Sequence, residues 1–161
     1  MAKTKDKPGD PQNQLVCKNR RAFHDYHIGD RFEAGLVLTG TEVKSCREGK
    51  AHLNEAYVHI VGSEAFLVGA HIAEYTAGNR FNHETARSRK LLLHRKEIDK
   101  LTIKVRQKGF TLVPLSLYFK NGYAKLEIAL AKGQVHRDQR QRLKERSADR
   151  EIQRALKHSK R

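Results

Sequence analysis

The chain has 161 residues, a length that suits one folded domain with terminal extensions. Its formal net charge is +15, so we expect an anionic partner, with nucleic acid as the first candidate. No apolar run approaches the roughly 18 residues of a membrane span, and no apolar signal-peptide core follows the N-terminus. We therefore expect a cytoplasmic protein that has no membrane segment.

The positive charge is concentrated at the two ends of the chain. Residues 134–161 contain ten Lys/Arg and four Asp/Glu, and residues 1–21 contain six and two. This distribution predicts a flexible N-terminal arm over 1–14, a folded domain over 15–133 and a basic C-terminal tail over 134–161. The alternative is that the basic ends only increase solubility, although acidic residues generally serve solubility better.

The first predicted elements are a strand and a short helix. Residues 31–40 (RFEAGLVLTG) are rich in apolar and β-branched side chains and end on turn residues, which indicates a strand. Thr39 and Glu42 stand three residues apart as in a capping box, so a helix should begin near residue 41. Gly49 can end that helix.

A hairpin and a second helix are predicted next. Residues 56–72 place apolar side chains on both sides of a Gly-Ser turn, which is typical of a β-hairpin. Ile98, Leu101 and Val105 recur at helical spacing, and Gly109 can close the helix that contains them.

The last part of the domain predicts another hairpin. Asn121-Gly122 readily takes the positive φ values of a type I′ turn, and the residues beyond it alternate between apolar and polar. Pro114 lies inside the preceding strand, which indicates an edge strand or a bulge. The whole pattern amounts to about six short antiparallel strands and two or three short helices. We therefore predict a mainly β fold, a closed OB-like antiparallel barrel.

The sequence contains no pattern that requires a metal, a cofactor or catalysis. His24 and His27 are three residues apart, but no third ligand follows at a recognisable spacing, so surface histidines are the better interpretation. Cys17 and Cys46 form no ligand pattern and are expected to be reduced thiols. We predict that the protein is not an enzyme, with a metal-dependent nuclease as the catalytic alternative.

Residues 79–96 carry a nucleic-acid signal. This segment places cationic side chains next to amides, histidines and Phe81, a combination that suits phosphate contact together with stacking on unpaired bases. The residues predicted to contact RNA here are Arg80, Asn82, Arg87, Arg89 and Lys90. A solvated loop that is rich in charge is the alternative.

Several longer motifs narrow this interpretation. The sequence contains FEAGLVLTGTEVKS, GNRFNHETARSRKLLLHRKEID, YFKNGYAKLEIALAKG and a terminal Asp-x-Arg tail. In order and spacing, from about Asn19 to the C-terminal end, these motifs resemble the small protein B (SsrA-binding protein) family, the bacterial partner of tmRNA in trans-translation. The resemblance implies an OB-like barrel that binds the tRNA-like domain of tmRNA.

The resemblance also implies particular RNA contacts. They fall on Asn19, with Arg20 beside it, and on Glu33, Leu91 and Lys125. Lys125 lies on the polar face of its strand and can meet phosphate. Glu33 cannot attract phosphate, so it would accept hydrogen bonds from base amino groups or a 2′-hydroxyl, or brace a nearby arginine. A fold-stabilising ion pair is the alternative for Glu33, and a place in the core is the alternative for Leu91.

The resemblance also implies a role for the tail. It implies a segment that is disordered in the free protein and helical in the ribosome, where it occupies the decoding centre and the mRNA channel. The positions expected at the decoding centre are Gly133, His136, Arg137, Asp138, Gln139 and Arg140. The family usually has His or Tyr followed by Asp-Lys-Arg. Here the ring is displaced by one residue and Gln139 replaces the lysine.

The expected partners are therefore tmRNA and the ribosome, including its small-subunit ribosomal RNA. We expect a monomer, one per tmRNA, without a cofactor and without contact to a membrane. A non-specific RNA chaperone or a ribosomal-type RNA-binding protein is the alternative function. That alternative explains the charge but not the series of motifs.

Overall fold

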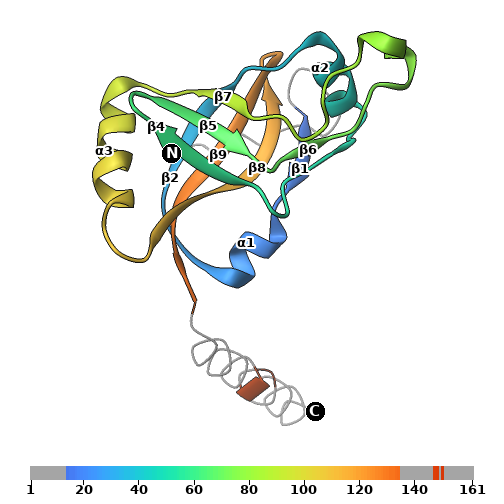
Figure 1. The fold of residues 1–161 in the computed structure, drawn as a ribbon. Helices are drawn as coiled ribbons and strands as arrows, with labels where there is room; N and C mark the ends of the chain where they lie inside the picture. The colour runs from blue at the N-terminus through green and yellow to red at the C-terminus, as the bar shows by residue number, and fades with distance from the viewer. Residues whose placement is uncertain (1–13, 135–146, 149, 151–161) are drawn as a thin grey trace, which may run out of the picture.

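The computed structural model describes residues 14–134, 147–148 and 150, and the structural statements below concern this part of the chain (Figure 1). The fold is mainly β with a few short helices, as predicted. The predicted arm and most of the predicted tail lie outside the described residues, so the predictions made for them are not addressed by the structure.

The elements follow one another as the colours of Figure 1 show. They are β1 (Leu15–Lys18), α1 (Arg20–Asp25), β2 (Tyr26–Leu36), α2 (Gly40–Arg47), β3 (Ala51–His52), β4 (Tyr57–Val61), β5 (Glu64–Val68), β6 (His71–Ile72), the 3-10 helix η1 (Thr76–Phe81), β7 (Arg89–Leu92), α3 (Arg95–Val105), β8 (Phe110–Lys120) and β9 (Tyr123–Gly133). The described residues form more strands than the six predicted. The strands β1, β3, β6 and β7 were not predicted because they are too short to show an alternating pattern.

Six of the described strands are paired in a closed cycle. β8 pairs with β4, β4 with β5, β5 with β7, β7 with β2, β2 with β9, and β9 pairs again with β8. β1 adds to β8, and β3 and β6 form a separate two-stranded sheet. The main hydrophobic cluster contains inward-facing residues of these strands, such as Leu67, Leu112 and Ile128. Each strand of the cycle therefore has a core-facing and an outward-facing set of side chains.

Local signals fix both longer helices. The backbone N–H of Thr39 donates to Oε2 of Glu42 at 2.8 Å, so α2 begins at Gly40 as its capping box predicts. The N–H of His94 donates to Glu97 in the same way at 3.0 Å, which starts α3. The apolar face of α3 is buried as expected. The helix ends at Val105 and not at the predicted Gly109, which lies in the following turn at φ 89°.

The β8–β9 hairpin confirms the turn prediction. Asn121 and Gly122 are the two loop residues, with φ values of 52° and 79°. Pro114 lies at a bulge, because the β8–β9 register shifts between Pro114 and Ser116. The alternative of an edge strand is wrong, since β8 pairs with β9 on one side and with β1 and β4 on the other.

A second, smaller core lies on the outward face beneath α1. On β9, Ile128 and Leu130 belong to the main core, whereas the alternate residues Ala129 and Ala131 pack with Ala22 of α1. The same outward face continues along β9 beyond α1, where its side chains are polar. α1 therefore covers one half of this face and leaves the other half exposed to solvent.

Candidate nucleic-acid interface

The uncovered half of the outward face carries a cluster of charged and hydrogen-bonding side chains on β2, β9 and β8. The β-ladder brings them together, because Glu33 is registered with Glu127, and Tyr118 with Lys125. We call this cluster the strand-face patch. It consists of Arg31, Glu33, Ser116, Tyr118, Lys120, Lys125 and Glu127.

Glu33 is held in place by two neighbours on β8. The Tyr118 hydroxyl donates to Glu33 Oε2 at 2.6 Å, and Lys120 Nζ lies 3.2 Å from the same oxygen. The hydrogen bond from Tyr118 is the main cause of a lowered pKa of Glu33, and the charges of Lys120 and Lys125 add to it. Glu33 is therefore an ionised acceptor, oriented by its neighbours and 39% exposed.

The second carboxylate of the patch is held similarly. Arg31 Nη1 lies 3.4 Å from Glu127 Oε1, and the Ser116 hydroxyl donates to the other oxygen at 3.1 Å. Three cations and two carboxylates leave the strand-face patch with a net positive charge. Phe23 of α1 borders it, with Lys18 Nζ at 5.5 Å and the Arg31 guanidinium at 5.7 Å from its ring centroid. Cations next to an aromatic ring and oriented acceptors are the groups with which proteins bind structured RNA.

Asn19 immediately precedes α1 and is only 2% exposed. Its Nδ2 donates to the carbonyls of Leu53 and Pro114, both at 3.0 Å, while its Oδ1 accepts from Ala22 N–H at 3.1 Å. Asn19 is thus the N-cap of α1 and joins it to β8. Its side chain is almost fully buried, whereas that of its neighbour Arg20 is exposed.

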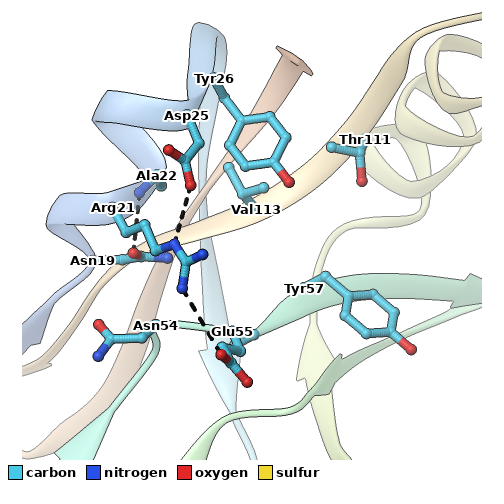
Figure 2. Close-up of a pocket in the computed structure, with 11 residues that line it drawn as sticks. Asn19, Arg21, Ala22, Asp25, Tyr26, Asn54, Glu55, Tyr57, Thr111 and Val113 are labelled. Carbon is cyan, nitrogen blue, oxygen red and sulfur yellow. Dashed lines mark hydrogen bonds and ion pairs between the residues drawn. The ribbon is translucent and has the colours of Figure 1, made fainter. Parts of the chain in front are cut away.

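A cavity of about 370 Å³ opens between α1, the β3–β4 connection and β8 (Figure 2). Arg21 crosses it, with Nε at 3.1 Å from Asp25 and Nη1 at 3.8 Å from Glu55. One guanidinium thus faces two carboxylates, and their combined charge disfavours phosphate. We therefore place the candidate interface on the strand-face patch and not in this cavity.

The cationic segment before α3 has a different organisation from the one predicted. Arg89 is fully buried and is not available at the surface. Its Nε donates to Glu42 Oε1 at 2.9 Å, and its Nη1 donates to the Ala70 carbonyl at 2.9 Å. Leu91, which is 2% exposed, belongs to the main core. Asn19, Arg89 and Leu91 are thus buried in the chain without RNA, and their contact with RNA stays a prediction.

Glu42 is the centre of this buried network. Arg87 Nη2 donates to its Oε2 at 2.6 Å, so one fully buried carboxylate pairs with two guanidinium groups. Burial raises the pKa of Glu42, but the hydrogen bonds from Arg87 and the Thr39 N–H and the charges of Arg89 and Arg87 outweigh it, so the pKa lies below its ordinary value. The network ties the 73–88 connection to α2.

The remaining predicted residues of this segment are accessible to different degrees. Lys90 is exposed and pairs with Glu64. Arg80 is exposed, and its guanidinium lies 5.5 Å from the centroid of the Phe81 ring. Asn82 is partly buried and hydrogen-bonds the backbone of Tyr75. Their contact with RNA stays a prediction.

The histidines, cysteines and carboxylates of the described residues form neither a metal site nor a reactive thiol. Over 14–134, no cluster of three or more His, Cys, Asp or Glu side chains could hold a metal ion. Burial raises the pKa of Cys17 to about 11 and that of Cys46 to about 12, so both thiols stay protonated at neutral pH. Among the described helices, none is long and apolar enough to cross a bilayer.

Sequence reasoning missed Arg31, Tyr118 and Lys120 as members of the site. The sequence signal that could have identified them is the alternation of inward-facing and outward-facing residues along β2 and β8. It places these three side chains on the same face as Glu33 and Lys125. The bulge after Pro114 shifts that alternation on β8, so the face of Tyr118 could not be assigned from periodicity alone.

Comparison with known proteins shows the family of the chain. A model of the SmpB protein family matches residues 16–158. The chain is 51% identical over 146 residues to an SsrA-binding protein of Shouchella clausii, covering 91% of this chain and 94% of that protein. It is 54% identical over 156 residues to an SsrA-binding protein of Thermobifida fusca, covering 97% and 98%.

One solved structure extends the comparison to three dimensions. Its description is "tmRNA-SmpB: a journey to the center of the bacterial ribosome", and its matching chain has a TM-score of 0.65 at 46% identity. The match covers 76% of this chain and 85% of that chain. The sequence and structure comparisons thus agree over most of the length, and the chain belongs to the SmpB protein family.

Proposed function

We propose that this chain binds the tRNA-like domain of tmRNA and delivers it to stalled ribosomes for trans-translation. The observation that carries the proposal is its likeness, at 46% identity, to a chain of a solved structure described by tmRNA, SmpB and the ribosome. The proposed role consists of binding in the cytoplasm by one monomer per tmRNA, and it requires no cofactor and no catalytic step.

The strand-face patch is the proposed RNA-binding surface. It offers cations for phosphates, an ionised and oriented acceptor in Glu33, and an aromatic neighbour in Phe23. The closed cycle of strands supports an OB-like barrel over 15–133 as the scaffold of this surface. Arg20 is exposed at the start of α1 and extends the cationic surface.

The C-terminal tail is the proposed ribosome-binding part. Its first residue is fixed to the folded domain, because Gln134 donates from its backbone N–H to the Asp25 carbonyl and from its side chain to the Tyr26 carbonyl. The remainder contains ten Lys/Arg against four Asp/Glu, which suits a channel lined by ribosomal RNA. We place the decoding-centre contacts at Gly133, His136, Arg137, Asp138, Gln139 and Arg140.

Lys125→Ala should reduce the salt dependence of tmRNA binding. Each phosphate contact contributes about −0.7 to −0.9 to the slope of log K against log salt, so the slope should become shallower by about one. The measurement is the affinity for a tRNA-like tmRNA fragment at several salt concentrations. Lys108→Ala, at an exposed lysine outside the patch, is the control. An unchanged slope for Lys125→Ala would show that Lys125 meets no phosphate.

Glu33→Ala should weaken RNA binding without lowering the melting temperature appreciably. The Glu33–Lys120 pair is largely exposed, and such pairs contribute only about 0–1 kcal/mol to stability. Loss of an oriented acceptor should instead lower the affinity for the tRNA-like fragment. Tyr118→Phe, which removes the hydroxyl that orients Glu33, should give a smaller loss in the same assay. A mutant that loses stability and affinity together would assign Glu33 to bracing the fold.

A further inference from the structure

Phe81 is the most exposed of the large hydrophobic residues in the described part of the chain, at 79%. It ends η1, in the connection between β6 and β7, and the Arg80 guanidinium lies 5.5 Å from its ring centroid. A single exposed phenylalanine is ordinary at a protein surface. Phe81 differs from such a residue because the turn before it is held in a strained conformation by hydrogen bonds.

The backbone beneath Phe81 is fixed by the Asn82 side chain. Its Oδ1 accepts from Tyr75 N–H at 2.9 Å, and its Nδ2 donates to the carbonyls of Tyr75 at 2.8 Å and Asn79 at 3.3 Å. The loop is closed so tightly that a Cβ on Gly78 would lie 2.8 Å from the Asn82 side chain. Asn79 adopts φ 47° and ψ −133°, a conformation that costs energy outside glycine.

The far side of the loop is anchored as well. His83 is buried, with Nδ1 at 2.9 Å from the Thr41 hydroxyl and Nε2 at 3.0 Å from the Ile72 carbonyl. Beyond it, the Glu42–Arg87 ion pair joins the same connection to α2. The strained turn is thus held from both ends. Strain that the surroundings maintain in this way is commonly found at binding sites.

The charges around Phe81 identify the kind of ligand. Arg80 lies over its ring, and Lys44 of α2 places its Nζ 5.2 Å from the ring centroid of Tyr75, which belongs to the same connection as Phe81. An apolar protein surface would have to desolvate these cations without pairing them, which is costly. An unpaired nucleotide would place its base on the ring and its phosphate near Arg80, and would thereby satisfy both groups.

We propose that Phe81 and Arg80 form a stacking site for an unpaired base of structured RNA. This inference rests on the proposed function, because it assumes an RNA partner. The chemistry is the same for an unpaired base of tmRNA and for one of ribosomal RNA, and the experiment below separates the two sources.

The variant Phe81→Trp places a fluorescent reporter in the site, because the chain contains no other tryptophan. We expect the fluorescence of this tryptophan to be quenched when a tRNA-like tmRNA fragment binds, or when ribosomes bind, and the RNA that quenches it is the source of the base. Ile103→Trp, on α3 outside the strand-face patch and 64% exposed, is the matched control for non-specific quenching. A blue shift without quenching would mean that protein covers the ring, and would overturn the proposal.

The affinity of Phe81→Leu should fall about 5- to 150-fold for the RNA that quenches the reporter, which is the range for loss of one base stack. Its salt slope and melting temperature should match those of the unchanged chain, since the leucine removes neither a charge nor a buried group. Unchanged affinity for both RNAs together with an unquenched reporter would overturn the stacking site while leaving the proposed function standing. If the unchanged chain itself bound neither RNA, that result would rule out the proposed function, and the stacking site with it.

Discussion

Glu42→Ala is expected to lower the free energy of unfolding by about 3–5 kcal/mol, the range for breaking a buried ion pair by removal of one partner. The change leaves the fully buried Arg89 guanidinium without its carboxylate and also releases Arg87. Stabilities can be compared by urea unfolding of the full chain. The control is Glu64→Ala, which removes an equivalent carboxylate from the exposed Lys90 pair and should change stability by at most about 0.5 kcal/mol.

The pH dependence of stability provides a second test of the same network. The folded-state pKa of Glu42 lies below its ordinary value of 4.5, so folding favours the ionised form. Its contribution is fully present above the unfolded-state pKa and is lost as the pH falls through the lower folded-state pKa. Glu42→Gln should therefore have a shallower loss of stability below about pH 4.5 than the unchanged chain. Equal acid profiles, or equal stabilities of Glu42→Ala and Glu64→Ala, would contradict the role of Glu42.

A chain that ends at Gln134 is expected to lose peptide tagging on stalled ribosomes while keeping its fold. β9 ends at Gly133, and the two Gln134 hydrogen bonds to α1 and β2 are retained, so the melting temperature should hardly change. Affinity for tmRNA should weaken only modestly, because the strand-face patch is intact. What the shortened chain lacks is the segment proposed to fill the decoding centre and the mRNA channel.

The tagging assay needs a control that separates charge from sequence. A full-length chain with residues 135–161 in scrambled order keeps the net charge of the tail but not the order of Arg137, Asp138 and Arg140. It should tag poorly if the decoding-centre contacts depend on particular residues. Normal tagging by the shortened chain on ribosomes stalled without a stop codon would show that the tail is accessory.

Much of the fold could be predicted from short-range patterns. The capping box of Thr39 and Glu42, the Asn121-Gly122 turn and the alternation on β9 each depend on chemistry within a few residues, and the structure shows all three. The short strands β3 and β7 could not be predicted, because they are stabilised by pairing with residues distant in the sequence. Propensity says little about segments of two to four residues.

The candidate site was predicted less completely, for the same reason. Arg89 and Arg87 look alike in sequence and both pair with Glu42, which lies 47 residues before Arg89, yet Arg89 is fully buried and Arg87 is partly exposed. The sequence also did not show that Asn19, a predicted RNA contact, caps α1. Charge composition identifies a polyanion-binding protein, but only the register of β2, β9 and β8 shows which side chains share a surface.

The proposed function depends on selective binding of tmRNA through the strand-face patch. The most direct measurement compares the dissociation constants of the full chain for a tRNA-like tmRNA fragment, an elongator tRNA and an RNA duplex of similar length at one physiological salt concentration. We expect a clear preference for the tmRNA fragment, and we expect the combined Glu33→Ala and Lys125→Ala variant to lose most of that preference while it keeps its melting temperature. Equal affinity for all three RNAs would rule out selective binding of tmRNA and favour a non-specific RNA-binding protein.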